Sequence, residues 1–340
     1  MKVHKEKLFG NYGSTVSDIA YPFNPRDMHD LAHLLKQDLV LAIKKVHFNI
    51  DQFYELSNSL GEVSTHGQRK DEPTKHLTGY HTEDGRPLYP GLDKVTAKKK
   101  VTNEYEGVAA GFSKRLNWHC AESQRDKISV YVGNDKSNKS KIERPLPEFV
   151  GLQGVTGTKG SVTQVCQTID RFEQESEAYQ EEMRNMKVRW AFVDGDEGIV
   201  PDIEESYRNE EFGHGGDHLM NKIKPLIARC TNGREGVHFS PSQVTEIVGY
   251  DEKQFQEWKD YFMKEYVTEK YIYDHVWDDG DILYMDQLNC IHRRTNVGGD
   301  VAGLSMQQLE QRLLHRIEFH VINEDDNTLG IDKIKKVKDN

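Results

Sequence analysis

Cysteine is scarce in this chain of 340 residues, and its placement argues against two kinds of site. The four cysteines, Cys120, Cys166, Cys230 and Cys290, are far apart, and no Cys-x-x-Cys pair occurs. A zinc site built on such pairs and a disulfide framework are therefore not expected. We expect a cytoplasmic protein, in a reducing intracellular compartment.

Long apolar runs and an excess of basic residues are missing as well. No segment approaches the roughly 20 consecutive apolar residues that span a bilayer, so we expect no membrane contact. The formal net charge is −11 at pH 7, whereas binding to extended nucleic acid requires concentrated lysine and arginine. Extended nucleic acid is therefore not an expected partner.

Hydrophobic periodicity predicts a single α+β domain over residues 1–340 with a β core. Many short strands with glycine between them indicate a sandwich or jelly roll. Helices are predicted at 24–37, 49–63, within 162–186 and at 251–267, and strands at 38–46, 106–112, 115–120, 127–133, 149–155, 281–288 and 313–322. The remaining segments are predicted as a loose N-terminal arm (1–20), a loop (64–90), a mobile lid-like excursion (194–217) and a C-terminal tail (323–340).

Three stretches carry residues that suit metal chemistry. His119 lies in "LNWHCAES", His292 ends "GDILYMDQLNCIH", and Arg312 and Arg316 bracket "RLLHR", where their spacing places them on one face of a strand. Two histidines and one carboxylate form the facial triad of non-haem Fe(II) oxygenases, which leaves metal positions open for a cosubstrate and dioxygen. An arginine suits the far carboxylate of such a cosubstrate, because its planar fork bonds both oxygens.

These stretches, together with "DQFYELSNSLGEV", "TGTKGSVT" and "KPLIARCTNGREGVHF", resemble the TauD/TfdA (taurine dioxygenase-like) family of Fe(II)- and 2-oxoglutarate-dependent oxygenases, over roughly residues 27–322. The resemblance extends to phage-borne members. It implies a double-stranded β-helix (jelly roll) with flanking helices and an enzyme that hydroxylates a small or medium molecule with dioxygen.

The resemblance also implies roles for particular residues. His119 and His292 would bind iron, and Thr163 and Arg312 would hold the distal carboxylate of 2-oxoglutarate. Arg316 would bind the substrate through an anionic group. Trp118 would pack behind the strand that carries the first histidine.

The chain departs from the family at the acidic ligand, which usually lies two residues after the first histidine. That position is Ala121, and the carboxylate, Glu122, comes one residue later. We predict Glu122 as the third iron ligand, brought to the histidine side by a bulge. The alternatives are a vacant slot at Ala121 that accepts chloride, as in halogenating relatives, another acid such as Asp126, or a non-catalytic jelly-roll binding protein that has lost the metal.

Four further stretches have simpler interpretations. His81 and Glu83 form a literal His-x-Glu, but they lie in a polar loop, so no metal site is expected there. The stretch "HGGDH" (214–218) is interpreted as part of a flexible lid. "TGTKGS" (156–161) lacks the ending of a phosphate-binding loop and is interpreted as a turn before Thr163. Arg293 and Arg294 are interpreted as surface charges or pocket rim.

Overall fold

The computed structural model describes residues 1–65, 68, 70–73, 78–96, 116–120, 127–132, 140–145, 148–190, 222–294 and 311–321. The predicted strand at 106–112, the excursion at 194–217 and the tail at 323–340 lie outside these residues. In the described ranges, no helix has the length and apolar character needed to cross a membrane.

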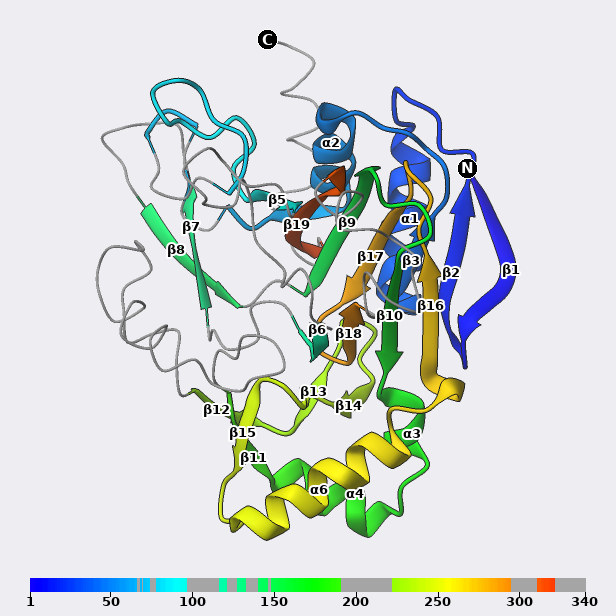
Figure 1. Cartoon of the computed structure of the whole chain (residues 1–340), viewed down its shortest axis with the longest axis vertical. Coiled ribbons are helices and arrows are strands. Elements are labelled where there is room, and N and C mark those ends of the chain that lie inside the picture. The colour runs from blue at the N-terminus through cyan, green and yellow to red at the C-terminus, as the bar shows by residue number, and fades with distance from the viewer. Residues whose placement is uncertain are drawn as a thin grey trace.

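The larger sheet has eight strands and carries two helices on its outer face. Its order is β1-β2-β3-β17-β9-β19-β4, with β5 also paired to β19. The strands are β1 (Lys2–Phe9), β2 (Tyr12–Ser17), β3 (Val40–Ile43), β4 (Gly61–Val63), β5 (Leu92–Thr96), β9 (Phe149–Thr156), β17 (Ile282–Asp286) and β19 (Leu313–Val321). The helices are α1 (Pro25–Asp38) and α2 (Ile50–Leu60), which appear at the upper end of the molecule in Figure 1.

Capping residues fix where both of these helices begin. Asn24 accepts a hydrogen bond from the backbone of Arg26, with Pro25 in the first turn, and Asn49 forms a capping box with Gln52. The apolar faces of the two helices pack on one face of the sheet in a core that includes Leu31, Leu35, Phe53, Leu56, Tyr284, Ile317 and Phe319. The predicted helix at 24–37 is confirmed, and the one at 49–63 is confirmed as far as Leu60, because Gly61–Val63 form β4.

A four-stranded sheet lies against the other face of the larger one. Its order is β16-β10-β18-β6, and its strands are β6 (Leu116–His119), β10 (Val162–Gln167), β16 (Ile272–Val276) and β18 (Cys290–Arg294). Side chains from both sheets share one interior core, which includes Val150, Val165, Leu283, Met285, Cys290 and Leu314. Two sheets around a common interior are the arrangement expected for a jelly roll.

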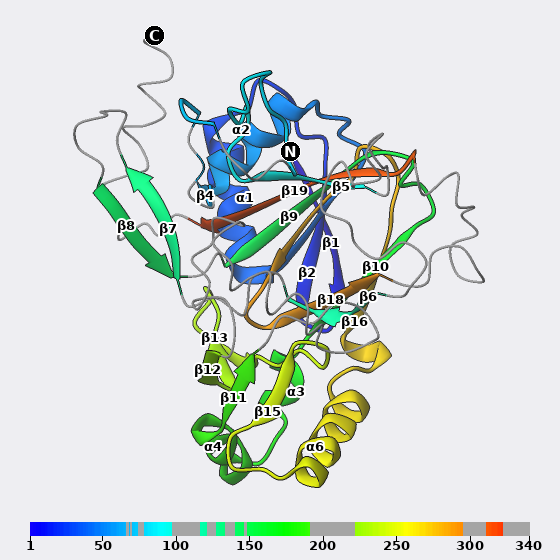
Figure 2. The same cartoon turned by 60° about the vertical axis from the view of Figure 1, so that its left-hand side comes forward.

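The outer face of the smaller sheet is covered by a second layer (Figure 2). This layer contains β11 (Lys187–Trp190), β12 (Lys222–Pro225), β13 (Ile227–Arg229), β14 (Glu235–Val237), β15 (Val244–Ile247), α3 (Ile169–Glu173), α4 (Glu177–Asn185), α6 (Glu252–Glu265) and the 3-10 turn η4 (Glu269–Tyr271). Its aromatic core, with Trp190, Phe239, Trp258 and Phe262, also contains Trp118, Cys166 and Ile291 from the sheet. A separate hairpin pairs β7 (Lys127–Val132) with β8 (Ser140–Pro145).

The prediction of a loose arm at residues 1–20 is wrong. Strands β1 and β2 form a hairpin, and β2 pairs in parallel with β3 at the edge of the larger sheet. Phe9, Tyr12 and Val16 are buried, and Lys7 forms an ion pair with the buried Asp38 at 2.6 Å. The signal was hidden because β1 is an edge strand with mostly exposed, charged side chains, which protect such an edge from pairing with other chains.

Candidate active site

His119 and His292 meet across two neighbouring strands. The two residues lie directly opposite each other on β6 and β18, and their ring centroids are 4.2 Å apart. Burial, then the nearby His119 and Arg316, keeps the pKa of His292 well below its ordinary value. This imidazole is therefore neutral, which is the form that binds a metal.

Side chains from the segment before β15 fix the backbone on both sides of His119. The hydroxyls of Ser240 and Ser242 donate to the Trp118 carbonyl at 2.8 and 2.7 Å. The Gln243 amide accepts from the backbone nitrogen of Cys120 at 2.8 Å and donates to its carbonyl at 2.9 Å. These bonds hold β6, which lies at the end of its sheet among the described strands, in one position.

Thr163 lies on the same face of the sheet as the two histidines. On β10 it is two residues from Val165, which lies directly opposite His292. Thr163 is buried, and its hydroxyl accepts a hydrogen bond from the indole nitrogen of Trp277 at 2.9 Å. Since side chains two residues apart on a strand share a face, the hydroxyl points into the interior between the sheets.

The glycine-rich turn before Thr163 brings the chain close to Arg312. Gly157 has a φ of +63°, and a Cβ there would lie 3.0 Å from the Gln311 carbonyl oxygen. Glycine therefore suits both the left-handed backbone and the close approach. Thr158 closes the turn with two hydrogen bonds to Asp279. The prediction that "TGTKGS" forms a turn is confirmed.

Arg312 is a buried positive charge whose Nε lacks an acceptor in the described part of the chain. Its side chain is 7% exposed, and no hydrogen-bond partner reaches that nitrogen there. Burial, then the positive charge of Arg294, lowers the pKa of Arg312 to about 9. A buried guanidinium is costly unless it is paired, so this environment favours a bound anion.

Arg316 lies on the interior side of β19 but already has an acidic partner. Its Nη2 donates to the Asp93 carboxylate at 2.8 Å, and its Nη1 lies 3.8 Å from the buried Glu318 carboxylate. Its charge also lowers the pKa of His292, so the guanidinium lies within electrostatic reach of the histidine pair.

Comparisons with known proteins identify the family of this chain. The family model described as "Taurine catabolism dioxygenase TauD, TfdA family" matches residues 135–317. The chain belongs to this family. The TauD/TfdA family uses Fe(II) and 2-oxoglutarate, and the predicted jelly-roll fold is confirmed.

Individual TauD/TfdA relatives are distant. The chain is 23% identical over 212 residues to pentalenolactone F synthase of Streptomyces arenae; the match covers 61% of this chain and 65% of that protein. A solved taurine dioxygenase from Burkholderia xenovorans superposes with a TM-score of 0.62 at 14% identity, covering 94% of this chain and 90% of the other. The structure of AAD-2 in complex with Mn(II) and N-oxalylglycine superposes with a TM-score of 0.62 at 12% identity. The match covers 95% of this chain and 99% of that chain. These two structures support the fold alone.

Fe(II) and 2-oxoglutarate, which the family requires, fit the side chains described above. The two histidines offer nitrogen ligands, and the Nε of Arg312 is a donor for a carboxylate. The predicted third ligand Glu122 lies outside the described residues, as do Ala121 and Asp126. Within the described ranges, no group of three metal-binding side chains occurs, at His81 and Glu83 or elsewhere.

Arg293 and Arg294 differ sharply from each other. Arg293 donates to Gln164 at 2.5 Å and lies 4.5 Å from the Trp118 ring centroid, on the outer side of the sheet. Arg294 is buried, directly opposite Thr163. The prediction that both belong to the surface or the rim is therefore wrong for Arg294. Strand alternation from His292 was the signal that could have placed it inside.

The turn that leads into β18 depends on the buried Asp286. Its Oδ1 accepts from the backbone nitrogens of Leu288 and Asn289 at 2.9 and 2.7 Å, while its Oδ2 has no partner in the described residues. Burial raises the pKa of this carboxyl to about 7, although the backbone hydrogen bonds oppose the shift. The native state therefore holds the Asp286 proton more tightly than the unfolded chain does.

We expect Asp286→Asn to remove this pH dependence. Because the pKa of Asp286 is higher in the native state, its stabilising effect is complete below the unfolded value near 4 and is lost as the pH rises through 7. The amide keeps an acceptor oxygen for the two backbone nitrogens and carries no charge at any pH. The variant should therefore melt at a higher temperature than wild type at pH 8, by a margin that shrinks at pH 5. Thermal unfolding across this range tests the difference. If the difference in melting temperature between Asp286→Asn and wild type were the same at every pH, Asp286 would not be the source of this pH dependence.

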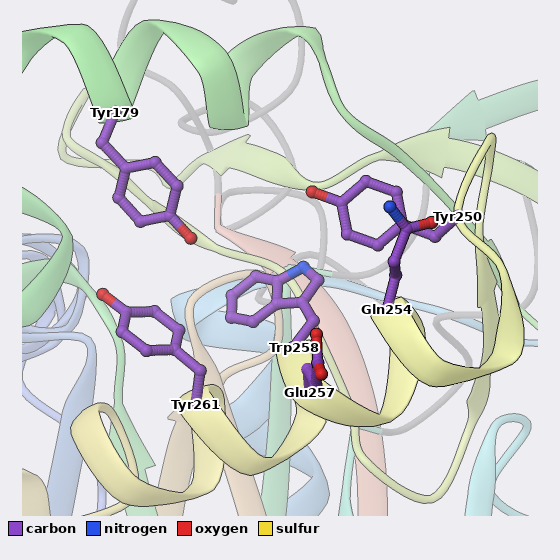
Figure 3. Close-up of a pocket in the computed structure, with 6 residues that line it drawn as sticks. All are labelled: Tyr179, Tyr250, Gln254, Glu257, Trp258 and Tyr261. Atoms are coloured by element: carbon purple, nitrogen blue, oxygen red, sulfur yellow. The ribbon is translucent and has the colours of Figure 1, made fainter.

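A separate hollow of about 300 Å³ lies between α4 and α6 in the second layer. Figure 3 shows the residues that line it: Tyr179, Tyr250, Gln254, Glu257, Trp258 and Tyr261. Neither histidine lines this hollow. The ring contacts of Tyr261 with Tyr179 and Trp258 make it part of the packing between the two helices.

Proposed function

We propose that this protein is an Fe(II)- and 2-oxoglutarate-dependent oxygenase that hydroxylates a C–H bond of a small or medium organic molecule. The observation that carries the proposal is the paired placement of His119 and His292 on neighbouring strands, with Thr163 on the same sheet face. Family membership supports the same reaction class.

The proposed roles of the described residues follow from their surroundings, and that of Glu122 from its place in the sequence after His119. His119, His292 and Glu122 would hold the iron, and Arg312 and Thr163 would bind the distal carboxylate of 2-oxoglutarate. When bound, iron and 2-oxoglutarate supply the activation of dioxygen, with the keto acid converted to succinate and carbon dioxide. The apolar interior around Val165 and Leu314 limits the access of water.

Arg316 remains our candidate for contact with the substrate. An anionic substrate group would have to share this guanidinium with Asp93, which lies opposite it on β5. The nearby Glu318 adds a second buried negative charge. We therefore expect an anionic substrate either to displace Asp93 from Arg316 or to bind the same guanidinium beside it.

We expect anaerobic addition of Fe(II) and 2-oxoglutarate to produce a weak visible charge-transfer band, and admission of oxygen to release succinate. Absorption spectroscopy and succinate analysis measure the two results. Arg312→Met should keep metal binding but require at least about tenfold more 2-oxoglutarate, since a charged hydrogen bond contributes roughly 1.5–3 kcal/mol. Absence of both band and succinate in the wild type would favour a non-catalytic jelly-roll binding protein.

A further inference from the structure

We propose that Arg294 is a second arginine of the 2-oxoglutarate pocket, and that it acts with Arg312 to select 2-oxo acids that carry a second carboxylate. This inference rests on the proposed function. It assigns a specificity-determining role to a residue outside the set predicted from the sequence.

The register of the smaller sheet places Arg294 beside Thr163. Arg294 follows His292 by two residues on β18, so both side chains leave the same face of the sheet. Across β18, β10 and β16, the residues Arg294, Thr163 and His275 lie in one row, directly opposite one another. Trp277, whose indole nitrogen donates to Thr163, belongs to the core between the two sheets. Arg294 therefore enters the interior at the hydroxyl that is proposed to bind the cosubstrate.

Arg294 and Arg312 are both buried, and the charge of one affects the other. The side chains are 6% and 7% exposed, respectively. The charge of Arg294 contributes to the lowered pKa of Arg312, so the two guanidiniums lie within electrostatic reach of each other. Two buried positive charges beside Thr163 make this part of the interior favourable for a carboxylate. A carboxylate bound there would accept charge-assisted hydrogen bonds from both guanidiniums.

The chemistry of the ligand follows from this arrangement. A 2-oxo acid with one carboxylate uses that group, with its keto oxygen, to chelate the metal. Only a 2-oxo acid with a second carboxylate at its far end can also reach the two arginines. Arg294 should therefore affect the binding of 2-oxoglutarate much more than the binding of 2-oxobutyrate, which has no second carboxylate.

The neighbouring Arg293 provides a matched control. It has the same charge and lies on the same strand, but its guanidinium contacts Gln164 and Trp118 on the outer side of the sheet. Replacing it changes the net charge of the protein by the same amount, without changing the interior. An effect of general electrostatics would appear in both variants, whereas direct recognition would appear only at Arg294.

The experiment compares Arg294→Met, Arg293→Met and wild type, each loaded with Mn(II) in the absence of oxygen. Calorimetry measures the dissociation constants of 2-oxoglutarate and 2-oxobutyrate. We expect Arg294→Met to weaken 2-oxoglutarate binding by about 10- to 100-fold and to leave 2-oxobutyrate within about twofold. Arg293→Met should bind both acids as the wild type does. Arg294→Lys keeps the charge but loses the planar guanidinium. It should weaken 2-oxoglutarate binding by a smaller factor and, like Arg294→Met, leave 2-oxobutyrate binding unchanged.

The possible outcomes separate the role of Arg294 from the proposed function. Unchanged 2-oxoglutarate affinity in both Arg294 variants, or an equal loss for both acids, overturns the role of Arg294. If Arg294→Met does not fold, the selectivity of Arg294→Lys between the two acids decides the question. Binding to wild type that is lost in Arg312→Met but unaffected in the Arg294 variants leaves the proposed function in place and removes only this inference. If the wild-type protein binds neither acid, both the role of Arg294 and the proposed function are rejected.

Discussion

Replacing His292 by alanine is expected to lower the affinity for Fe(II) or Mn(II) by at least about 100-fold. Loss of a residue that only supports a ligand already costs about 10- to 100-fold in metal affinity, and loss of the ligand itself should cost more. His119→Ala should give a similar loss, because its ring lies against that of His292. An anaerobic metal titration, followed by analysis of bound metal after gel filtration, measures the effect.

His315 is the matched control for this prediction. It is buried, and burial followed by the charge of Lys94 lowers its pKa to about 4. Both of its ring nitrogens are engaged, however, by Gln153 at 2.9 Å and Tyr80 at 2.8 Å, so it has a structural role. His315→Ala should lower the melting temperature and keep metal binding. Metal binding that survives in both His292→Ala and His119→Ala would remove the basis of the proposed site.

Local signals in the sequence predicted most of the helices and several strands. Asn24-Pro25 and the Asn49–Gln52 capping box mark helix starts through contacts between residues close in sequence. The helix predicted within 162–186 is present, but as α3 and α4 after the strand β10. Here an apolar strand runs directly into a helical pattern, and periodicity alone does not separate the two.

Contacts between residues far apart in sequence could not be predicted in the same way. The pairing of His119 with His292 depends on the register of β6 and β18, which no local pattern encodes. The pairing of Arg316 with Asp93 joins residues 223 positions apart, and it changes the expected role of a conspicuous arginine. The inward position of Arg294, in contrast, could have been predicted from the sequence. Once His292 was placed on a strand facing inward, alternation was sufficient to place Arg294 inside as well.

The second large effect is expected at Glu122, where replacement by alanine should reduce metal affinity by at least about 100-fold. The surroundings of Cys120 bear on how this side chain could reach the metal. The Gln243 amide pairs with both backbone groups of Cys120, so a side chain holds the backbone at this point. A bulge after Cys120, as predicted from the sequence, would bring an acid three residues beyond His119 to the histidine side.

A second substitution in the Glu122→Ala background separates the three alternatives for the acid. On a regular strand, residue 121 faces the same side as His119, whereas a bulge that brings residue 122 to that side turns residue 121 away. Adding Ala121→Asp should therefore fail to restore metal binding if Glu122 binds the metal through a bulge, and should restore it if the strand is regular. Asp126→Asn alone should leave metal affinity unchanged. If Glu122→Ala instead keeps its iron affinity and that affinity depends on chloride, the slot at Ala121 accepts a halide, and the reaction class shifts from hydroxylation to halogenation. If only Asp126→Asn loses the metal, the third ligand is Asp126, because a facial triad needs one carboxylate wherever the chain supplies it.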